Sequence, residues 1–341
     1  MNLFDLNKVA QAMVATGKGL LAADESTGTI KKRFDAIGVD SNPDSRRDYR
    51  EMLFRSKEAM SKYISGVILY DETIWQEAKD GTPLVKLIEQ AGAIPGIKVD
   101  EGTQALPNCP GELVTVGLDK LAERLKKYYE RGARFAKWRA VIDIGPGIPS
   151  YAAIRTNTHA LARYAALCQA AQIVPIVEPE VLMDGDHTLE RCEAVTDTTL
   201  ASVFNQLNAH RIYLEGMVLK PNMVISGKKC ATRANAQQVA EATVRCLKRH
   251  VPSAVPGIAF LSGGQSSEEA TEHLSLMNKL GPLPWSLTFS YGRALQDTAL
   301  KTWGGKTESF VAGQKAFAKR AKLNGLATTG AYAASMEKDA A

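Results

Sequence analysis

The chain of 341 residues has little cysteine, no long apolar run and no large excess of charge of either sign. Its five cysteines are widely scattered and never form a CxxC pair, which argues against both a disulfide framework and a zinc site. Reduced thiols of this kind favour a cytoplasmic protein. They are Cys109, Cys168, Cys192, Cys230 and Cys246.

No apolar stretch approaches the roughly 20 residues that a membrane-spanning helix needs. Residues 1–19 mix charged residues with helically spaced apolar ones, whereas a secretory signal needs an uninterrupted apolar block. We therefore expect an amphipathic helix at the amino terminus, and a soluble protein with no membrane partner. The composition, 45% hydrophobic and 23% charged, is typical of a globular protein with a large core.

The formal net charge of +5 is modest and is not gathered into a basic tract. Nucleic-acid binding usually requires a basic stripe or patch, so we expect no nucleic-acid partner. Local clusters of lysine and arginine are better suited to a small polyanion. The charge pattern therefore favours a small anionic metabolite as ligand.

Short β-like runs alternate with longer amphipathic stretches, and eight such pairs can be counted. Most runs are continuously apolar, as expected of strands that are covered on both faces. The stretches between them, such as 119–132, 199–210 and 234–250, are long enough to cross back over a sheet. The β-like runs cover residues 19–24, 66–72, 95–100, 135–145, 173–182, 212–222, 257–264 and 286–292.

This alternation predicts an α/β protein with a (β/α)8 TIM barrel, that is, a closed barrel of eight parallel strands with extra helices. An open, doubly wound sheet is the structural alternative. No Pro/Gly/Ser-rich linker or internal repeat divides the chain. We expect one domain over residues 1–341, with a flexible, small and polar tail from about Ala331.

Polar side chains occur at or near the ends of most predicted strands, where TIM barrels carry their chemistry. Side chains at i and i+2 share one face of a strand, so Lys137 lies with Arg139 and Glu178 lies with Glu180. Buried charges are costly unless they are paired or used, so a structural salt-bridge layer of the Lys137–Glu178 kind is the alternative to a reactive site. The strand-end set is Asp24, Lys98, Lys137, Arg139, Glu178, Glu180, Lys220, Ser262, Ser290 and Arg293.

A lysine at a barrel mouth can act as a nucleophile. Its amine loses a proton when it is desolvated or placed beside another cation, and it then forms a Schiff base with a carbonyl. Either Lys220 or Lys137 fits this role, and we expect each to lower the pKa of the other. Glu178 could shuttle protons during loss of water, while Asp24 could take a hydroxyl proton from the substrate.

The segment LSGGQSSEEA (261–270) is typical of a phosphate-binding turn. Gly263 and Gly264 allow backbone N–H groups to approach an anion, and a helix with a capping box follows at Ser266. Arg293 lies in FSYGR (289–293), after the eighth strand, and barrels often hold phosphate after strands seven and eight. An ordinary βα turn is the alternative.

Two other motifs invite different chemistry. DGDH (184–187) could be interpreted as metal ligands, but the other histidines fall on helical stretches, and we expect no metal. WGGKT (303–307) suggests a P-loop, which would require glycine where Leu300 stands. We expect a surface turn there.

Seven motifs, in the same order along the chain, resemble those of class I fructose-bisphosphate aldolases, the metal-free Schiff-base type. They are LAADESTGTIKKR, GIKVDEG, FAKWR, IVPIVEPE, LEGMVLKPN, FLSGGQS and LTFSYGRALQ, within a match from about Leu20 to Tyr332. The resemblance implies reversible cleavage of fructose 1,6-bisphosphate to dihydroxyacetone phosphate and glyceraldehyde 3-phosphate. It also implies a homotetramer without a cofactor.

The resemblance further implies a role for each matched residue. Lys220 would be the Schiff-base nucleophile, Glu178 the proton shuttle and Lys137 an activating cation. Asp24 would take the proton of the fourth-carbon hydroxyl, and Glu180 would support the network. Lys98 and Arg139 would line the cleft. One phosphate would be held by Ser262, Gly263, Gly264, Ser290, Gly292 and Arg293, and the other by Ser26, Thr29, Lys32 and Arg33.

The carboxyl terminus departs from the family pattern. Animal members end in a tyrosine that is thought to assist proton exchange at the enamine, whereas this chain ends MEKDAA. Two rival functions stay open, namely a pyridoxal-phosphate enzyme and a non-catalytic phosphosugar-binding protein. Fructose 1-phosphate and sedoheptulose 1,7-bisphosphate also stay open as substrates.

Overall fold

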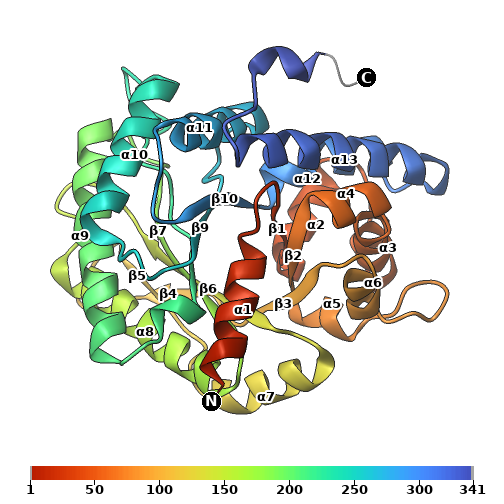
Figure 1. Cartoon of the computed structure of the whole chain (residues 1–341), viewed down its shortest axis with the longest axis horizontal. Coiled ribbons are helices and arrows are strands. Elements are labelled where there is room, and N and C mark those ends of the chain that lie inside the picture. Colours follow the sequence, from red (N-terminus) through yellow and green to blue (C-terminus); the bar gives the residue numbers. More distant parts are fainter. Residues whose placement is uncertain (1, 339–341) are drawn as a thin grey trace.

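A computed structural model describes residues 2–338, in which eight parallel strands close into a barrel (Figure 1). The order around the barrel is β1-β10-β9-β8-β7-β6-β3-β2, and every hydrogen-bonded neighbour pair is parallel. The closed barrel confirms the predicted TIM fold and rules out the open sheet. Its strands are β1 (Gly19–Ala23), β2 (Ile64–Leu69), β3 (Ile94–Lys98), β6 (Phe135–Ile142), β7 (Val174–Val181), β8 (Val218–Leu219), β9 (Gly257–Phe260) and β10 (Ser286–Tyr291).

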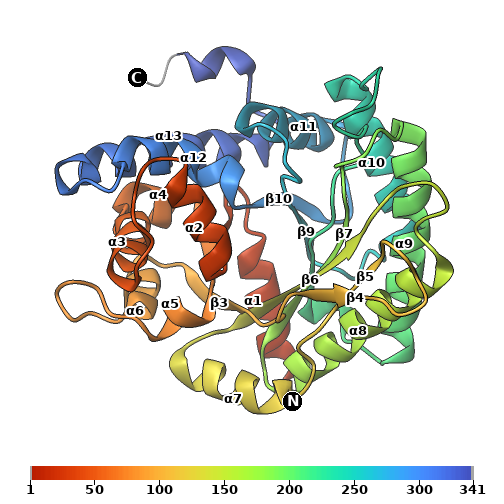
Figure 2. The same cartoon turned by 180° about the vertical axis from the view of Figure 1, so that it is seen from behind.

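Helices surround the barrel on all sides (Figures 1 and 2). The group α2–α6 lies on one side and α8–α10 lie on the opposite side. None of the helices between residues 2 and 338 combines the length and the apolar character needed to cross a bilayer. They are α1 (Leu3–Met13), α2 (Thr27–Asp35), α3 (Pro43–Phe54), α4 (Lys57–Lys62), α5 (Asp71–Trp75), α6 (Leu84–Gln90), α7 (Leu121–Arg131), α8 (Tyr151–Ala170), α9 (Leu189–Ala209), α10 (Ala236–His250), α11 (Ser267–Lys279), α12 (Arg293–Trp303) and α13 (Phe310–Ala327).

Helix α1 packs against the apolar interior of the barrel. Its buried residues Leu6 and Met13 belong to one cluster with the barrel residues Phe135 and Val218. Along β7 the interior face begins with the apolar Val174 and Ile176 and continues, two residues at a time, with Glu178 and Glu180. The interior therefore changes from apolar at the amino-terminal ends of the strands to charged at the carboxyl ends, where the site lies.

The structure differs from the predicted elements in three places. β8 is only two residues long, because residues Leu214–Gly216 form a 3-10 turn before it and Pro221, which lacks an N–H donor, follows Lys220. A short hairpin of β4 (Thr103–Ala105) and β5 (Leu113–Thr115) was not predicted. α9 begins ten residues before the predicted stretch, where Thr188 caps it by accepting from the N–H of Arg191.

The carboxyl-terminal segment is anchored at least as far as Glu337. A 3-10 turn spans Ala334–Glu337, and the Glu337 carboxylate accepts hydrogen bonds from Tyr332 and Arg320, each at 2.8 Å. Residues 339–341, the end of the predicted flexible tail, lie outside the described residues. The WGGKT segment is a turn, as predicted, because Gly304 caps α12 with a left-handed φ of 54°.

Candidate active site

The carboxyl ends of the strands surround two adjoining cavities of about 300 and 310 Å³. The first, here called the lysine cavity, is lined by Lys220 and by the turn that follows β9. The second, the outer cavity, is lined by the start of α2 and by Lys98. They share Asp24, Lys137 and other residues, so every predicted site residue except Lys32 lines at least one of them.

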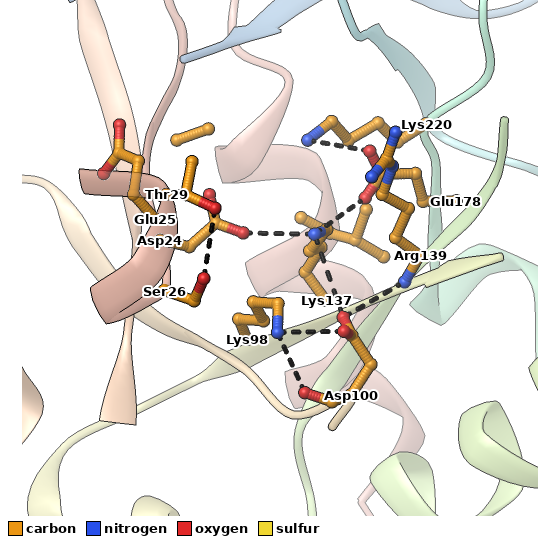
Figure 3. A network of polar contacts seen from close by, with 12 residues as sticks. Asp24, Glu25, Ser26, Thr29, Lys98, Asp100, Lys137, Arg139, Glu178 and Lys220 are labelled. Atoms are coloured by element: carbon orange, nitrogen blue, oxygen red, sulfur yellow. Dashed lines mark hydrogen bonds and ion pairs between the residues drawn. The ribbon is translucent and has the colours of Figure 1, made fainter. Parts of the chain in front are cut away.

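Glu178, on β7, lies between two lysines, one on β6 and one directly after β8, the strands on either side of β7 (Figure 3). One carboxylate oxygen is 3.3 Å from Lys137 Nζ, and the other is 3.3 Å from Lys220 Nζ. All three residues are at most 4% exposed. The carboxylate can therefore accept a proton from one amine or return it to a group attached there, while the other lysine holds it in place.

Lys137 is surrounded by carboxylates. Its Nζ lies 3.1 Å from Asp24, 3.3 Å from Glu178 and 3.9 Å from Asp100. Burial opposes the charge, but attraction by these three carboxylates outweighs burial and raises the pKa of Lys137. This result corrects the expectation that Lys220 would lower the pKa of Lys137. Lys137 is a permanent ammonium ion, which leaves Lys220 as the candidate nucleophile.

Asp24 is held as a carboxylate at the end of β1. Burial by itself would raise its pKa, but Lys137, Lys220 and Lys98 together lower the pKa well below its ordinary value. The charge of Lys137 lowers the pKa most, and Lys137 Nζ also donates a hydrogen bond to Asp24 at 3.1 Å. At neutral pH Asp24 is therefore available to accept a proton from a bound substrate.

Two further ion pairs border the buried network. Arg139 donates to Glu180, and Lys98 Nζ lies 2.9 Å from Asp100. Burial alone would lower the pKa of Arg139, but Glu180 and nearby carboxylates raise the pKa by more than burial lowers it. The guanidinium therefore stays charged. Asp100 was missed by the sequence reasoning, although it ended the predicted run 95–100 and lies two residues after Lys98 on the same alternation.

The turn after β9 has the backbone that anion binding requires. Gly263 and Gly264 adopt left-handed φ angles of 53° and 78°, which side-chain-bearing residues rarely adopt. The predicted capping box is present, since Ser266 and Glu269 bond reciprocally at 3.0 and 3.1 Å at the start of α11. Beside this turn, Ser290 Oγ is buried with no hydrogen-bond partner among residues 2–338.

The second predicted anion group lies at the start of α2. Ser26 precedes α2, and its hydroxyl lies 3.1 Å from that of Thr29. Arg33 reaches both cavities and pairs with Glu25 at 2.5 Å. Lys32 lines a third cavity of about 360 Å³ beside α12, together with Thr29, Arg33 and Arg293. Ser26, Thr29 and Arg33 thus line the outer cavity, and Lys32 shares the third cavity with Thr29 and Arg33.

The DGDH segment does not assemble as a metal site. Asp184 pairs with Lys228 at 2.7 Å, and His187 is buried with neither ring nitrogen bonded within the described part of the chain. Burial lowers the pKa of His187, so its ring is neutral. Across residues 2–338, no group of three or more His, Cys, Asp or Glu side chains is placed to hold a metal ion.

Comparisons with known proteins agree with this geometry. Residues 5–341 match the family model described as fructose-bisphosphate aldolase class-I. A probable fructose-bisphosphate aldolase class 1 of Xanthomonas campestris is 55% identical over 97% of this chain and 99% of its own length. Fructose-bisphosphate aldolase B of Gallus gallus is 52% identical, covering 98% of this chain and 93% of its own.

The fold has a close counterpart among solved structures. Fructose-bisphosphate aldolase from Plasmodium falciparum, solved in complex with TRAP and a small molecule inhibitor, superposes with a TM-score of 0.95. It is 49% identical in sequence, and the match covers 97% of this chain and 96% of that one.

Proposed function

The chain belongs to the class-I fructose-bisphosphate aldolase family, and we propose that it cleaves fructose 1,6-bisphosphate through an imine on Lys220. The observation that carries the proposal is the 3.3 Å contact between Lys220 Nζ and Glu178. Among residues 2–338, Lys220 contacts one carboxylate and Lys137 contacts three, so we assign the nucleophile to Lys220. A neutral amine in a buried, polar cavity is the form that attacks a ketone.

Formation of the imine uses the Lys137–Glu178–Lys220 group as a unit. The amine of Lys220 attacks the second-carbon ketone and gives a carbinolamine. Glu178, after accepting a proton from Lys220, returns a proton to the departing hydroxyl, and water leaves. The charged ammonium of Lys137 stabilises the negative charge that develops on the oxygen. The product is a protonated imine, whose positive charge attracts electrons from the neighbouring bond.

Cleavage of the bond between the third and fourth carbons needs a base at the fourth-carbon hydroxyl. Asp24 is suited to this because its lowered pKa keeps it ionised. As Asp24 takes the hydroxyl proton, the bonding electrons move to the imine, glyceraldehyde 3-phosphate leaves and an enamine remains. Protonation of the enamine and hydrolysis of the imine release dihydroxyacetone phosphate and free Lys220.

The two cavities support separate sites for the two phosphates. The first carbon is bonded to the imine carbon, so its phosphate must lie in the lysine cavity. There it would be held by Ser262, Gly263, Gly264, Ser290, Gly292 and Arg293. The phosphate on the sixth carbon would lie in the outer cavity with Ser26, Thr29, Arg33 and Lys98. Asp24 and Lys137 line both cavities, which supports the proposal that they lie beside the bond to be broken.

Location and assembly are also part of the proposal. All five cysteines are free thiols, as suits a reducing cytoplasm. One relative, 54% identical, is a cytosolic fructose-bisphosphate aldolase of Arabidopsis thaliana. We propose a cytoplasmic homotetramer built from single-domain barrels. Light scattering that gives the mass of one chain would overturn the tetramer.

The test of function is cleavage of fructose 1,6-bisphosphate in excess chelator, with wild type, K220R and the matched surface variant K229R. Wild type and K229R should be active and K220R inactive, because an arginine does not form an imine. Loss of wild-type activity in chelator, or full activity of K220R, would overturn the mechanism. An absorption band from bound pyridoxal phosphate would favour that rival. Parallel assays with fructose 1-phosphate and sedoheptulose 1,7-bisphosphate would rank the substrates.

A further inference from the structure

Lys228 was not among the predicted site residues, yet the fold holds it at the rim of the lysine cavity. It lies on a strap formed by residues 183–187, after β7, and residues 227–229, after β8. Three backbone hydrogen bonds join the two segments. They run from Gly227 N to His187 O at 2.8 Å, from Lys228 N to Met183 O at 2.8 Å and from Lys229 N to Gly185 O at 3.0 Å.

The strap is closely packed at its centre. A Cβ atom added at Gly227 would lie 2.3 Å from the carbonyl oxygen of Gly185, which no side chain could tolerate. The backbone before Lys228 is therefore fixed against the opposite segment. A fixed backbone limits where the ammonium of Lys228 can reach, so its position over the cavity follows from the fold.

The ammonium group of Lys228 reaches the phosphate turn. A Cβ atom added at Gly264 would lie 2.8 Å from Lys228 Nζ and 3.2 Å from Arg293 Nη2. Two cations from different strand ends thus flank the same glycine. Like charges repel, so an arrangement of this kind is stable when an anion lies between them.

Two other features of the lysine cavity favour an anionic ligand, namely an unbonded hydroxyl and an exposed ion pair. The hydroxyl of Ser290 is 1% exposed and has no hydrogen-bond partner among residues 2–338. Lys228 itself pairs with Asp184 at 2.7 Å, but their side chains are 42% and 63% exposed. An ion pair this exposed contributes little and is easily exchanged. A phosphate dianion carries more charge than Asp184 and can also engage Arg293 and the backbone N–H groups of the turn.

We propose that Lys228 binds the phosphate on the first carbon of the substrate, exchanging Asp184 for a phosphate oxygen when the cavity is filled. This inference rests on the proposed aldolase function, because it assigns one more residue to the same phosphate. Asp184 holds the ammonium in place in the empty cavity. Lys228 in turn neutralises a carboxylate that would otherwise repel the incoming dianion.

The test uses the condensation reaction, in which dihydroxyacetone phosphate occupies the lysine cavity and glyceraldehyde 3-phosphate the outer one. K228M should raise KM for dihydroxyacetone phosphate about tenfold, the loss expected for one hydrogen bond to a charged group, and leave KM for glyceraldehyde 3-phosphate unchanged. K229M removes the same charge from the adjacent exposed lysine and should change neither constant. K228R should retain most of the affinity, and D184N should lower KM for dihydroxyacetone phosphate.

A K228M variant that behaves like K229M, or that raises both KM values equally, would overturn the assignment. Calorimetric titration with inorganic phosphate separates this inference from the enzymatic one, since it needs no turnover. There K228M should weaken phosphate binding about tenfold relative to wild type and K229M. Equal phosphate affinity in all three proteins contradicts the role of Lys228, whereas absence of condensation by wild type contradicts the proposed function alone.

Discussion

Replacing Lys137 by methionine should separate the contribution of the buried network to stability from its contribution to catalysis. The substitution keeps the volume of the side chain but removes the cation between three carboxylates. Glu178 would keep Lys220 as a partner, and Asp100 would keep Lys98. Asp24 has its only ion pair with Lys137 among residues 2–338, so it would be left as a buried charge without a close counterion.

Breaking a buried pair in this way costs about 3–5 kcal/mol in the free energy of unfolding. The pH dependence follows from the lowered pKa of Asp24, which in wild type makes a contribution that is complete above the unfolded pKa and is lost as pH falls through the folded pKa. Without Lys137 the effect of burial raises the pKa of Asp24, so protonation relieves the penalty. The stability deficit of K137M should therefore be largest near neutral pH and shrink on acidification.

Urea unfolding of wild type, K137M and K137R at neutral and mildly acidic pH measures the deficit. K137R keeps the charge and should lose less stability. The double variant K137M with Asp24→Asn should recover much of the stability, since no charge is stranded, yet stay as inactive as K137M. We expect kcat to fall about a hundred- to ten-thousandfold in both. A K137M protein as stable as wild type at neutral pH would refute the reasoning.

Each of three further predictions rests on one local feature. G264A should raise KM for fructose 1,6-bisphosphate about tenfold by crowding Lys228. Gly17 has the same φ of 78° but open space around an added Cβ, so G17A should share the backbone strain and leave KM unchanged. Equal KM values in the two variants would contradict a role for the turn. Truncation after Tyr332 should leave turnover largely intact and lower stability by about 1 kcal/mol through loss of the Glu337 contacts; a collapse of turnover would show that the tail takes part in catalysis. Burial lowers the pKa of His273 to about 4, so wild type should lose up to about 3 kcal/mol of stability between pH 6.5 and 4 that H273Q does not lose; parallel unfolding curves of the two proteins would contradict this.

Much of the fold and of the site could be predicted, because the strands of a barrel have apolar runs and a side-chain alternation that can be recognised in the sequence. Continuous apolar runs indicated strands covered on both faces, and alternation correctly placed Glu178 beside Glu180 inside the barrel. The Lys137–Glu178 ion pair, first considered as a purely structural alternative, is present at 3.3 Å. It is part of a network that also contacts Lys220, so the structural and reactive interpretations describe one set of contacts.

Other features depend on three-dimensional placement that local pattern does not encode. The pKa of Lys137 was expected to fall because Lys220 is a cation, but three carboxylates from three different strand ends lie within 3.9 Å. Lys228 lies in a glycine-containing loop without periodicity, and only the backbone pairing of two strand-end segments directs it to the phosphate turn. The sequence also did not indicate that Thr29, Lys32 and Arg33 would line a separate cavity with Arg293, which comes from the start of α12.

The most direct test of the central claim is borohydride reduction of the enzyme with dihydroxyacetone phosphate in excess chelator, followed by mass mapping of the modified peptide. The reduced, stable adduct should lie on Lys220 in wild type and should not form in K220R. An adduct on Lys137, or no adduct together with activity that depends on added metal, would contradict the imine mechanism.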